Sequence, residues 1–226
     1  MKWSISKQVY EHHLQASPST QLIHSLTRRA CVVSCAVALV LLAPSAAQAH
    51  LVNSGMGPFY DGVMHLALSP DDWLGLLAAA LLAGLCGARA GRWTLAVLPA
   101  AWLFGAIVGL SAPVFPESQS VSILSFVVLG LLVALDTKLP AWGVASIGGV
   151  FGLLHGLQNG VALHAADGSL IDVLGIVTTV FVLSLLVSAA VVSLRPAWTR
   201  VAVRVAGSWV VAVGMLMIGW LFRAAA

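Results

Sequence analysis

Charged residues are scarce in this chain: Lys, Arg, Asp and Glu together make up 8% of its 226 residues. Soluble domains carry about 25% of such residues. Hydrophobic residues make up 60% of the chain, and the mean hydropathy is +0.98. Several apolar runs approach the ~20 residues that a helix needs to cross a bilayer. This composition excludes a soluble protein and predicts an all-α integral membrane protein.

The first 49 residues have the pattern of a secretory leader. A polar stretch ends in a twin arginine, an apolar core follows, and the tripeptide A-Q-A stands directly before His50. An A-x-A tripeptide at this place is typical of a signal-peptidase site. We therefore predict a signal peptide over residues 1–49 and a single transmembrane domain over residues 50–226. An uncleaved signal anchor is the alternative.

Loss of the leader changes what charge and cysteine imply. Of eleven Lys and Arg residues four lie in the leader, and of eight Asp and Glu residues one does, so seven of each remain. The pI near 9.0 thus reflects the leader and does not indicate binding to nucleic acid. Cys86 is then the only cysteine, which excludes a disulfide within the mature chain. The absence of a G-x-x-x-x-G-K-[ST] motif gives no sign of nucleotide binding.

Six apolar segments predict six transmembrane helices, near residues 72–88, 93–112, 120–135, 140–163, 170–194 and 201–222. Basic residues favour the cytoplasmic side of a membrane. If the mature N-terminus is outside, six of the seven mature basic residues fall at cytoplasmic turns, and only Arg223 falls outside. We therefore predict a multi-pass protein of the bacterial inner membrane with both mature termini in the periplasm.

The fourth segment contains the polar stretch "FGLLHGLQNGVAL", residues 151–163. His155 and Asn159 are four residues apart and therefore share one face of a helix. Ionisable side chains inside a membrane are costly and usually functional; the alternative is that this pair only forms interhelical hydrogen bonds. Glycines recur every fourth residue in the same segment and predict close packing against another helix: Gly148, Gly152, Gly156 and Gly160.

A second polar stretch, "GPFYDGVMHLALSPDDW", precedes the first segment. Asp61 and His65 share a face if this stretch forms a short interfacial helix. Ser69, followed by a proline and two aspartates, resembles a helix-capping arrangement. Capping would explain Asp72 without any ligand, but it does not explain His65. Asp172 follows Ser169 by the same spacing, and we assign it a capping role only.

Histidines beside carboxylates suit a borderline divalent cation such as Ni²⁺, Co²⁺, Cu²⁺ or Zn²⁺. A free N-terminal His50 would add its α-amine and its ring nitrogen, whereas His164 is interpreted as a loop histidine. We expect the metal to pass through rather than to stay as a bound cofactor. The candidate metal ligands are His65, Asp71, His155, Asn159, Asp72, His50 and Asp61.

These residues resemble the motifs of the HupE/UreJ family, as does the signal peptide that ends just before a histidine. The family pattern H-P-x-x-G-x-D-H is similar to "HLALSPDD", which keeps His65 and Asp71 and has Asp72 at the second histidine position. The later pattern H-G-x-x-H-G is similar to "HGLQNG", which keeps His155 and has Asn159 at the second histidine position. Both departures replace an imidazole by a harder, oxygen-bearing side chain.

The resemblance implies a small membrane protein associated with nickel or cobalt uptake for hydrogenase and urease. It implies a permease that takes a divalent transition-metal cation from the periplasm along a path lined by His, Asp and Asn. The alternatives are a membrane accessory or scaffold protein for metalloenzyme maturation, and a haem protein with His65 and His155 as axial ligands. The pattern is compatible with a homo-oligomer.

An enzyme of the rhomboid protease type is the remaining alternative, because such proteases also have six spans. It requires a serine in a Gly-x-Ser setting and a later intramembrane histidine as base. No histidine follows His164, and no Gly-x-Ser occurs in the later segments. We therefore do not expect an enzyme.

Overall fold

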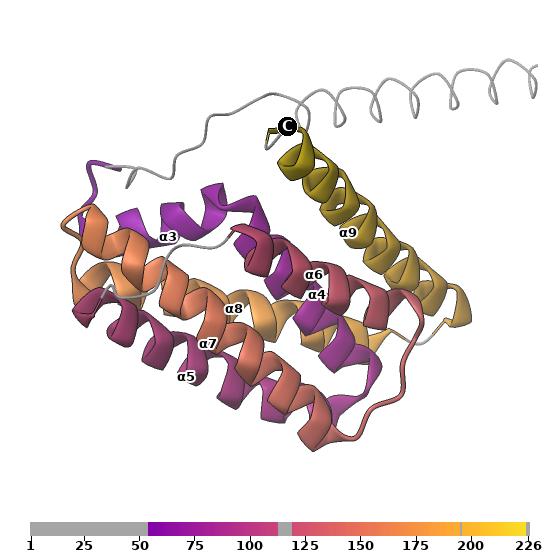
Figure 1. Ribbon diagram of the computed structural model, residues 1–226. Helices are drawn as coiled ribbons and strands as arrows, with labels where there is room; N and C mark the ends of the chain where they lie inside the picture. Colours follow the sequence, from indigo (N-terminus) through magenta and orange to yellow (C-terminus); the bar gives the residue numbers. More distant parts are fainter. Residues whose placement is uncertain (1–53, 113–118, 195, 225–226) are drawn as a thin grey trace, which may run out of the picture. The chain divides into compact units, whose positions relative to one another are not determined.

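The computed structural model describes residues 54–112, 119–194 and 196–224, and the regular elements in this part of the chain are all α-helices (Figure 1). The predicted all-α class is thus confirmed. In chain order the helices are α3 (Pro58–Leu68), α4 (Pro70–Leu85), α5 (Ala88–Ser111), α6 (Gln119–Ala134), α7 (Ala141–Ala165), α8 (Leu170–Ser193) and α9 (Ala197–Ala224).

A sharp bend at Ser69 separates α3 from α4. Pro70 has no N–H to donate, and its ring disfavours a helical conformation in the residue before it. Ser69 accordingly adopts an extended backbone, with φ −99° and ψ 90°, and the axes of the two helices differ by 79°. The stretch through Asp61 and His65 forms the short helix α3, and its last turn leads directly into the first turn of α4.

Helix α7 packs against α5 through the predicted glycines. A Cβ atom at Gly152 would lie 2.5 Å from the carbonyl oxygen of Leu98, and one at Gly156 would come closer still to the carbonyl oxygen of Trp102. Only glycine permits this approach of two backbones. Gly160 makes the same kind of contact with the carbonyl oxygen of Ala106, whereas a Cβ atom at Gly148 would lie 3.0 Å from a side-chain carbon of Thr94.

Three further glycine contacts position the helices around α4. Gly62 of α3 faces the carbonyl oxygen of Asp172 in α8, and Gly175 of α8 faces that of Phe59 in α3. Helix α6 packs against α9, where a Cβ atom at Gly130 would lie 3.0 Å from the carbonyl oxygen of Gly207. These contacts hold α3 against α8 and α6 against α9.

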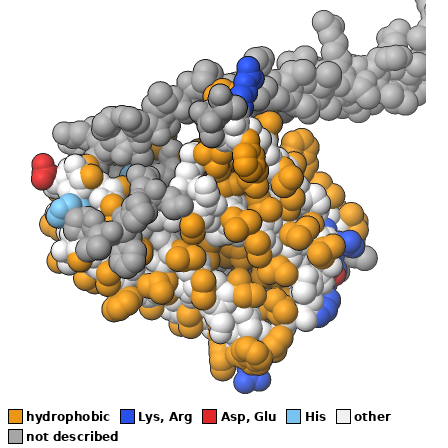
Figure 2. All heavy atoms as spheres, in the orientation of Figure 1, with side chains coloured by type: hydrophobic (Ala, Val, Ile, Leu, Met, Phe, Trp, Pro, Cys, Tyr) orange, Lys and Arg blue, Asp and Glu red, His pale blue; other side chains and the backbone are white. Residues whose placement is uncertain are grey.

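The outer face of the molecule is apolar, as expected for a chain that spans a membrane. Hydrophobic side chains cover most of the face in Figure 2, and the few charged side chains lie toward its edges. By length and composition, α5, α8 and residues 198–223 of α9 can each cross a membrane, and α3 with α4 makes a fourth span if the bent pair counts as one.

The predicted count of six spans is only partly supported. The six predicted segments correspond to α4 through α9, but α4 and α6 have 16 residues each. Helix α7 is long enough, with 25 residues. Its glycines and polar side chains make it less apolar than α5, α8 and α9. Six spans therefore remain a prediction, and α3 is an additional helix that the segment count did not include.

The turns predicted to be cytoplasmic lie together at one end of the helices. Arg200 of α9 donates two hydrogen bonds of 2.7 Å to the carboxylate of Asp136, which follows α6. Lys138 donates to the same carboxylate at 3.1 Å. Cys86, which follows α4, contacts the carbonyl oxygen of Thr137 at 3.5 Å. This common end is what the distribution of basic residues predicted, and the side of the membrane it faces remains a prediction.

Candidate functional site

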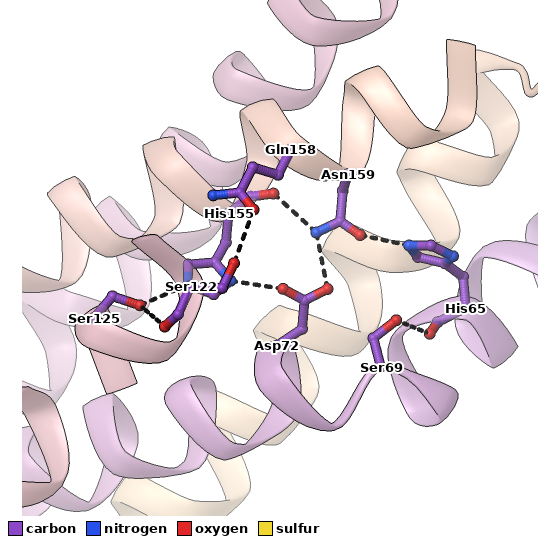
Figure 3. Close-up of polar contacts among 8 residues, drawn as sticks. All are labelled: His65, Ser69, Asp72, Ser122, Ser125, His155, Gln158 and Asn159. Carbon is purple, nitrogen blue, oxygen red and sulfur yellow. Dashed lines mark hydrogen bonds and ion pairs between the residues drawn. The ribbon is translucent and has the colours of Figure 1, made fainter. Parts of the chain in front are cut away.

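Four buried polar side chains form a continuous chain of hydrogen bonds across α3, α4 and α7 (Figure 3). His155 Nδ1 lies 2.6 Å from Asp72 Oδ1. Asn159 Nδ2 donates to Asp72 Oδ2 at 2.9 Å. Asn159 Oδ1 lies 2.6 Å from His65 Nε2. We call His65, Asp72, His155 and Asn159 the polar cluster.

The amide of Asn159 sets the direction of these hydrogen bonds. Its Nδ2 donates to Asp72 Oδ2 and also to the carbonyl oxygen of His155 at 2.8 Å, so both of its hydrogens are engaged. The amide oxygen can only accept, and His65 must therefore donate from Nε2. Asn159 thus links the imidazole of α3 to the carboxylate of α4.

The polar cluster is enclosed by apolar groups. His155 is fully buried, and His65, Asp72 and Asn159 are each at most 6% exposed. The ring of Phe151 lies 4.1 Å from the ring of His155, measured between centroids. In such surroundings a charge that lacks a partner is costly. The carboxylate of Asp72 therefore requires a proton or a cation close by.

Three further polar side chains extend the cluster from the other side of His155. Ser125 Oγ lies 2.8 Å from His155 Nε2 and donates to the carbonyl oxygen of Ser122 at 2.7 Å. Ser122 Oγ in turn donates to Gln158 Oε1 at 2.8 Å. No sequence motif pointed to these three residues, although Gln158 stands within the polar stretch of α7. The available signal was the pair of serines three residues apart at the start of α6.

The carboxylate in the cluster comes from Asp72 and not from Asp71. The resemblance had paired His65 with Asp71, the aspartate that keeps its place in the family pattern. In the structure Asp71 is half-buried in the first turn of α4. Among the described residues, the hydrogen bonds that join the cluster pass through the carboxylate of Asp72. Asp72, which stands where the family has a histidine, meets His155 directly.

The remaining candidates lie elsewhere. Asp61 Oδ1 accepts a hydrogen bond of 2.6 Å from the backbone N–H of Ser54, just before α3. His164 lies in the last turn of α7, and its Nδ1 is 2.9 Å from the carbonyl oxygen of Leu110 at the end of α5. His50 lies outside the described residues. Asp61 therefore bonds the residues just before α3, and His164 bonds the end of α5, rather than the polar cluster.

The capping role expected of Ser69 and Asp72 was wrong. Ser69 does precede α4, but its hydroxyl donates to the carbonyl oxygen of His65 at 2.8 Å instead of capping the helix. Asp72 turns its carboxylate toward α7. By contrast, the capping box predicted for Ser169 and Asp172 is present: the Asp172 carboxylate accepts from the backbone N–H of Ser169 at 2.7 Å. The same S-x-x-D spacing thus forms a capping box at α8 and directs its aspartate to another helix at α4.

The cluster is not arranged as a finished metal site. No group of three or more His, Cys, Asp or Glu side chains in the described part of the chain could hold a metal ion as it stands. A metal with bonds of ~2.0–2.1 Å to nitrogen and oxygen holds the two ligand atoms about 2.9 Å apart or more. His155 Nδ1 and Asp72 Oδ1 are 2.6 Å apart, so they must separate by a few tenths of an ångström to admit one.

Comparison with known proteins gives the family. The family model described as HupE / UreJ protein matches residues 37–217. The chain is also similar to Protein HupE of Rhizobium leguminosarum bv. viciae, with 27% identity over 183 residues, which cover 79% of this chain and 93% of that protein. No solved structure matches. With its apolar helices and a family match that includes the whole polar cluster, this multi-pass membrane protein belongs to the HupE/UreJ family.

Proposed function

We propose that this protein is a membrane permease for a divalent transition-metal cation, with nickel or cobalt as the first candidates. The cation enters from the periplasm and passes through the polar cluster. One observation carries this proposal: two imidazoles, a carboxylate and an amide from three helices converge in an otherwise apolar interior. Membership of the HupE/UreJ family supports it, because the family points to a nickel- or cobalt-associated membrane protein.

The hydrogen-bonded pair of His155 and Asp72 gives the cation a place to bind. Their facing atoms share one hydrogen at 2.6 Å, and a divalent cation that replaces it would be bound by one nitrogen and one oxygen. Metal ligands must offer free lone pairs, which the cluster gains when this hydrogen leaves. His65 and the oxygen of Asn159 would add a second nitrogen and a second oxygen once the imidazole of His65 carries its hydrogen on Nδ1 instead of Nε2. Imidazole biases such a mixed set toward nickel, cobalt, copper and zinc.

The membrane potential suffices to drive such a cation inward. A potential of 100 mV, inside negative, favours entry of a divalent cation by about 4.6 kcal/mol, twice the value for one charge. This energy requires no nucleotide. The bilayer and the transported ion are then the only partners that the proposed function needs.

A non-transporting accessory protein is the second candidate. It is favoured by the fact that the carboxylate of Asp72 and the amide of Asn159 already have partners within the cluster. Such a network can hold α3, α4 and α7 together without any metal. A measurement of transport is therefore needed to separate the two candidates.

The test is uptake into proteoliposomes that contain a metal-sensitive dye and carry an inside-negative potential. The wild-type protein is expected to take up Ni²⁺ or Co²⁺, and His65→Ala and His155→Ala are each expected to abolish this uptake while the protein remains folded. His164→Ala is the matched control, because it removes an imidazole as the other two variants do. His164 lies in the last turn of α7, away from the polar cluster.

The outcomes separate the candidates. Uptake that persists in His155→Ala would remove this residue from the path. A folded wild-type protein that transports none of the first-row divalent metals would favour the accessory role. A Soret band in the absorbance spectrum of the purified protein would instead favour the haem alternative.

A further inference from the structure

Ser125 of α6 contacts His155, although neither the sequence motifs nor the family resemblance single it out. Its hydroxyl oxygen lies 2.8 Å from His155 Nε2 and 2.7 Å from the carbonyl oxygen of Ser122. A hydroxyl has one hydrogen to donate and two lone pairs to accept with. When Ser125 donates to Ser122, it can therefore only accept from His155, which must then carry its hydrogen on Nε2.

The position of that hydrogen decides which nitrogen of His155 can bind a metal. A neutral imidazole has one N–H and one nitrogen with a free lone pair. With the hydrogen on Nε2, the lone pair is on Nδ1, and Nδ1 is the atom that faces Asp72 Oδ1 at 2.6 Å. Metal-binding histidines in proteins generally donate their second N–H to a fixed acceptor in this way.

Ser125 can also form a hydrogen bond with His155 when no metal is bound. If the hydrogen between His155 and Asp72 belongs to Nδ1, Nε2 needs a donor. The Ser125 hydroxyl can provide one by rotating about its C–O bond, because the carbonyl oxygen of Ser122 does not depend on it for its helical hydrogen bond. One serine can thus pair with either tautomer of a fully buried ring. Alanine can pair with neither.

We propose that Ser125 is a positioning residue that holds His155 with its hydrogen on Nε2 when a divalent metal ion is bound between His155 Nδ1 and Asp72 Oδ1. This inference rests on the proposed function and adds to it the identity of the ligand atom and of the residue that orients it. The imidazole remains neutral in both states, because the proton that leaves Nδ1 for water is matched by one that water supplies at Nε2.

The first test is Co²⁺ binding by the purified full-length protein in detergent, followed by the visible absorbance of the bound ion. Ser125→Ala is expected to weaken binding by roughly 10–100-fold, the usual effect of removing a partner of a metal-binding histidine. Ser125→Thr keeps the hydroxyl and is expected to restore most of the affinity. Ser188→Ala is the control, because the Ser188 hydroxyl is buried and bonds carbonyl oxygens of its own helix.

The variants distinguish this inference from the proposed function. If the wild type binds none of the first-row divalent metals, the proposed function fails and the inference fails with it. If the wild type binds and a folded Ser125→Ala binds equally well, only the inference is overturned. Equal losses in Ser125→Ala and Ser125→Thr would also overturn it, because they would indicate packing rather than the hydroxyl. A thermal melting curve for each variant shows whether it is folded.

The second test reads the tautomer directly. In protein labelled with ¹⁵N-histidine and loaded with diamagnetic Zn²⁺, the NMR signals of His155 are expected to show a hydrogen on Nε2 and the metal on Nδ1. His155→Ala identifies these signals by their loss. A spectrum with Zn²⁺ on Nε2 would overturn the inference whatever the binding affinities are.

Discussion

Asp72 and Asp172 each follow a serine by three residues at the start of a helix, but their side chains have different partners. Asp172 accepts from the backbone of Ser169 and closes a capping box. Asp72 bonds His155 and Asn159 on another helix. The difference arises because Ser69 follows α3 directly, so its hydroxyl finds the carbonyl oxygen of His65, and the carboxylate of Asp72 is left to pair across the helices.

We predict that substitution by serine affects metal uptake at Asp72 and stability at Asp172. Asp72→Ser is expected to abolish metal uptake, because it removes the only carboxylate of the polar cluster. Asp172→Ser is expected to lower the free energy of unfolding by about 1 kcal/mol, as loss of a helix cap does, and to leave uptake in the folded protein unchanged. Uptake assays on both variants, each checked by thermal melting, measure the two effects. Near-normal uptake by Asp72→Ser would return this residue to a structural role.

At the scale of the element, α7 carries packing and polar groups on adjacent faces. Its glycines face α5, and His155 and Asn159 lie beside them and face α4. Gly156 directly follows His155, so the backbone that presents the imidazole also forms the close contact with Trp102. Packing of α7 against α5 thus sets how far His155 reaches toward Asp72.

We predict that Gly156→Ala destabilises the protein and also reduces uptake. The added methyl group would overlap the carbonyl oxygen of Trp102, and forcing an extra group into a packed interior costs about 1–3 kcal/mol. Gly219→Ala is the matched control, because a Cβ atom there meets nothing within 4 Å beyond its chain neighbours and its own helical backbone. Thermal melting is expected to show a lower midpoint for Gly156→Ala only. Equal midpoints would mean that α5 and α7 pack less closely than described.

At the scale of the whole molecule, the basic turns and the polar cluster lie at different depths. The ion pair of Asp136 with Arg200 joins the turn after α6 to the start of α9, and Lys138 pairs with Asp136 within that turn. His155 lies ten residues from the end of α7, which is about 15 Å at 1.5 Å per residue. The polar cluster is therefore nearer to the end opposite the basic turns, which is the side from which we propose that the metal enters.

We predict the orientation accordingly. Alkaline phosphatase, which becomes active only after export, is expected to be active when fused after Ala226 and inactive when fused after Lys138. The physical reason is the retention of Arg and Lys on the cytoplasmic side. A cytoplasmic reporter fused at the same two positions serves as the control and should give the reverse pattern. Activity of the phosphatase after Lys138 would contradict the predicted orientation.

The sequence alone determined the properties that depend on local spacing. The scarcity of charge identified the bilayer as the solvent, and apolar runs located α4 through α9 to within a few residues. Spacings of four placed Gly152 and Gly156 on one helix face, and His155 and Asn159 on one face, because four residues make about one helical turn. The shared helix faces follow from these patterns, and in the structure the glycines face α5 while His155 and Asn159 both bond Asp72.

Only the tertiary structure decided which aspartate joins the cluster and what holds His155. Asp71 and Asp72 are neighbours, and on a helix neighbouring side chains point about 100° apart. Which of the two meets α7 depends on the 79° bend at Ser69 and on the register of α4 along α7. Residue spacing within one helix predicts neither the bend angle nor this register. The same holds for Ser125, whose hydroxyl meets His155 across 30 residues of sequence, because the register between two packed helices is set by the side chains and glycines of both.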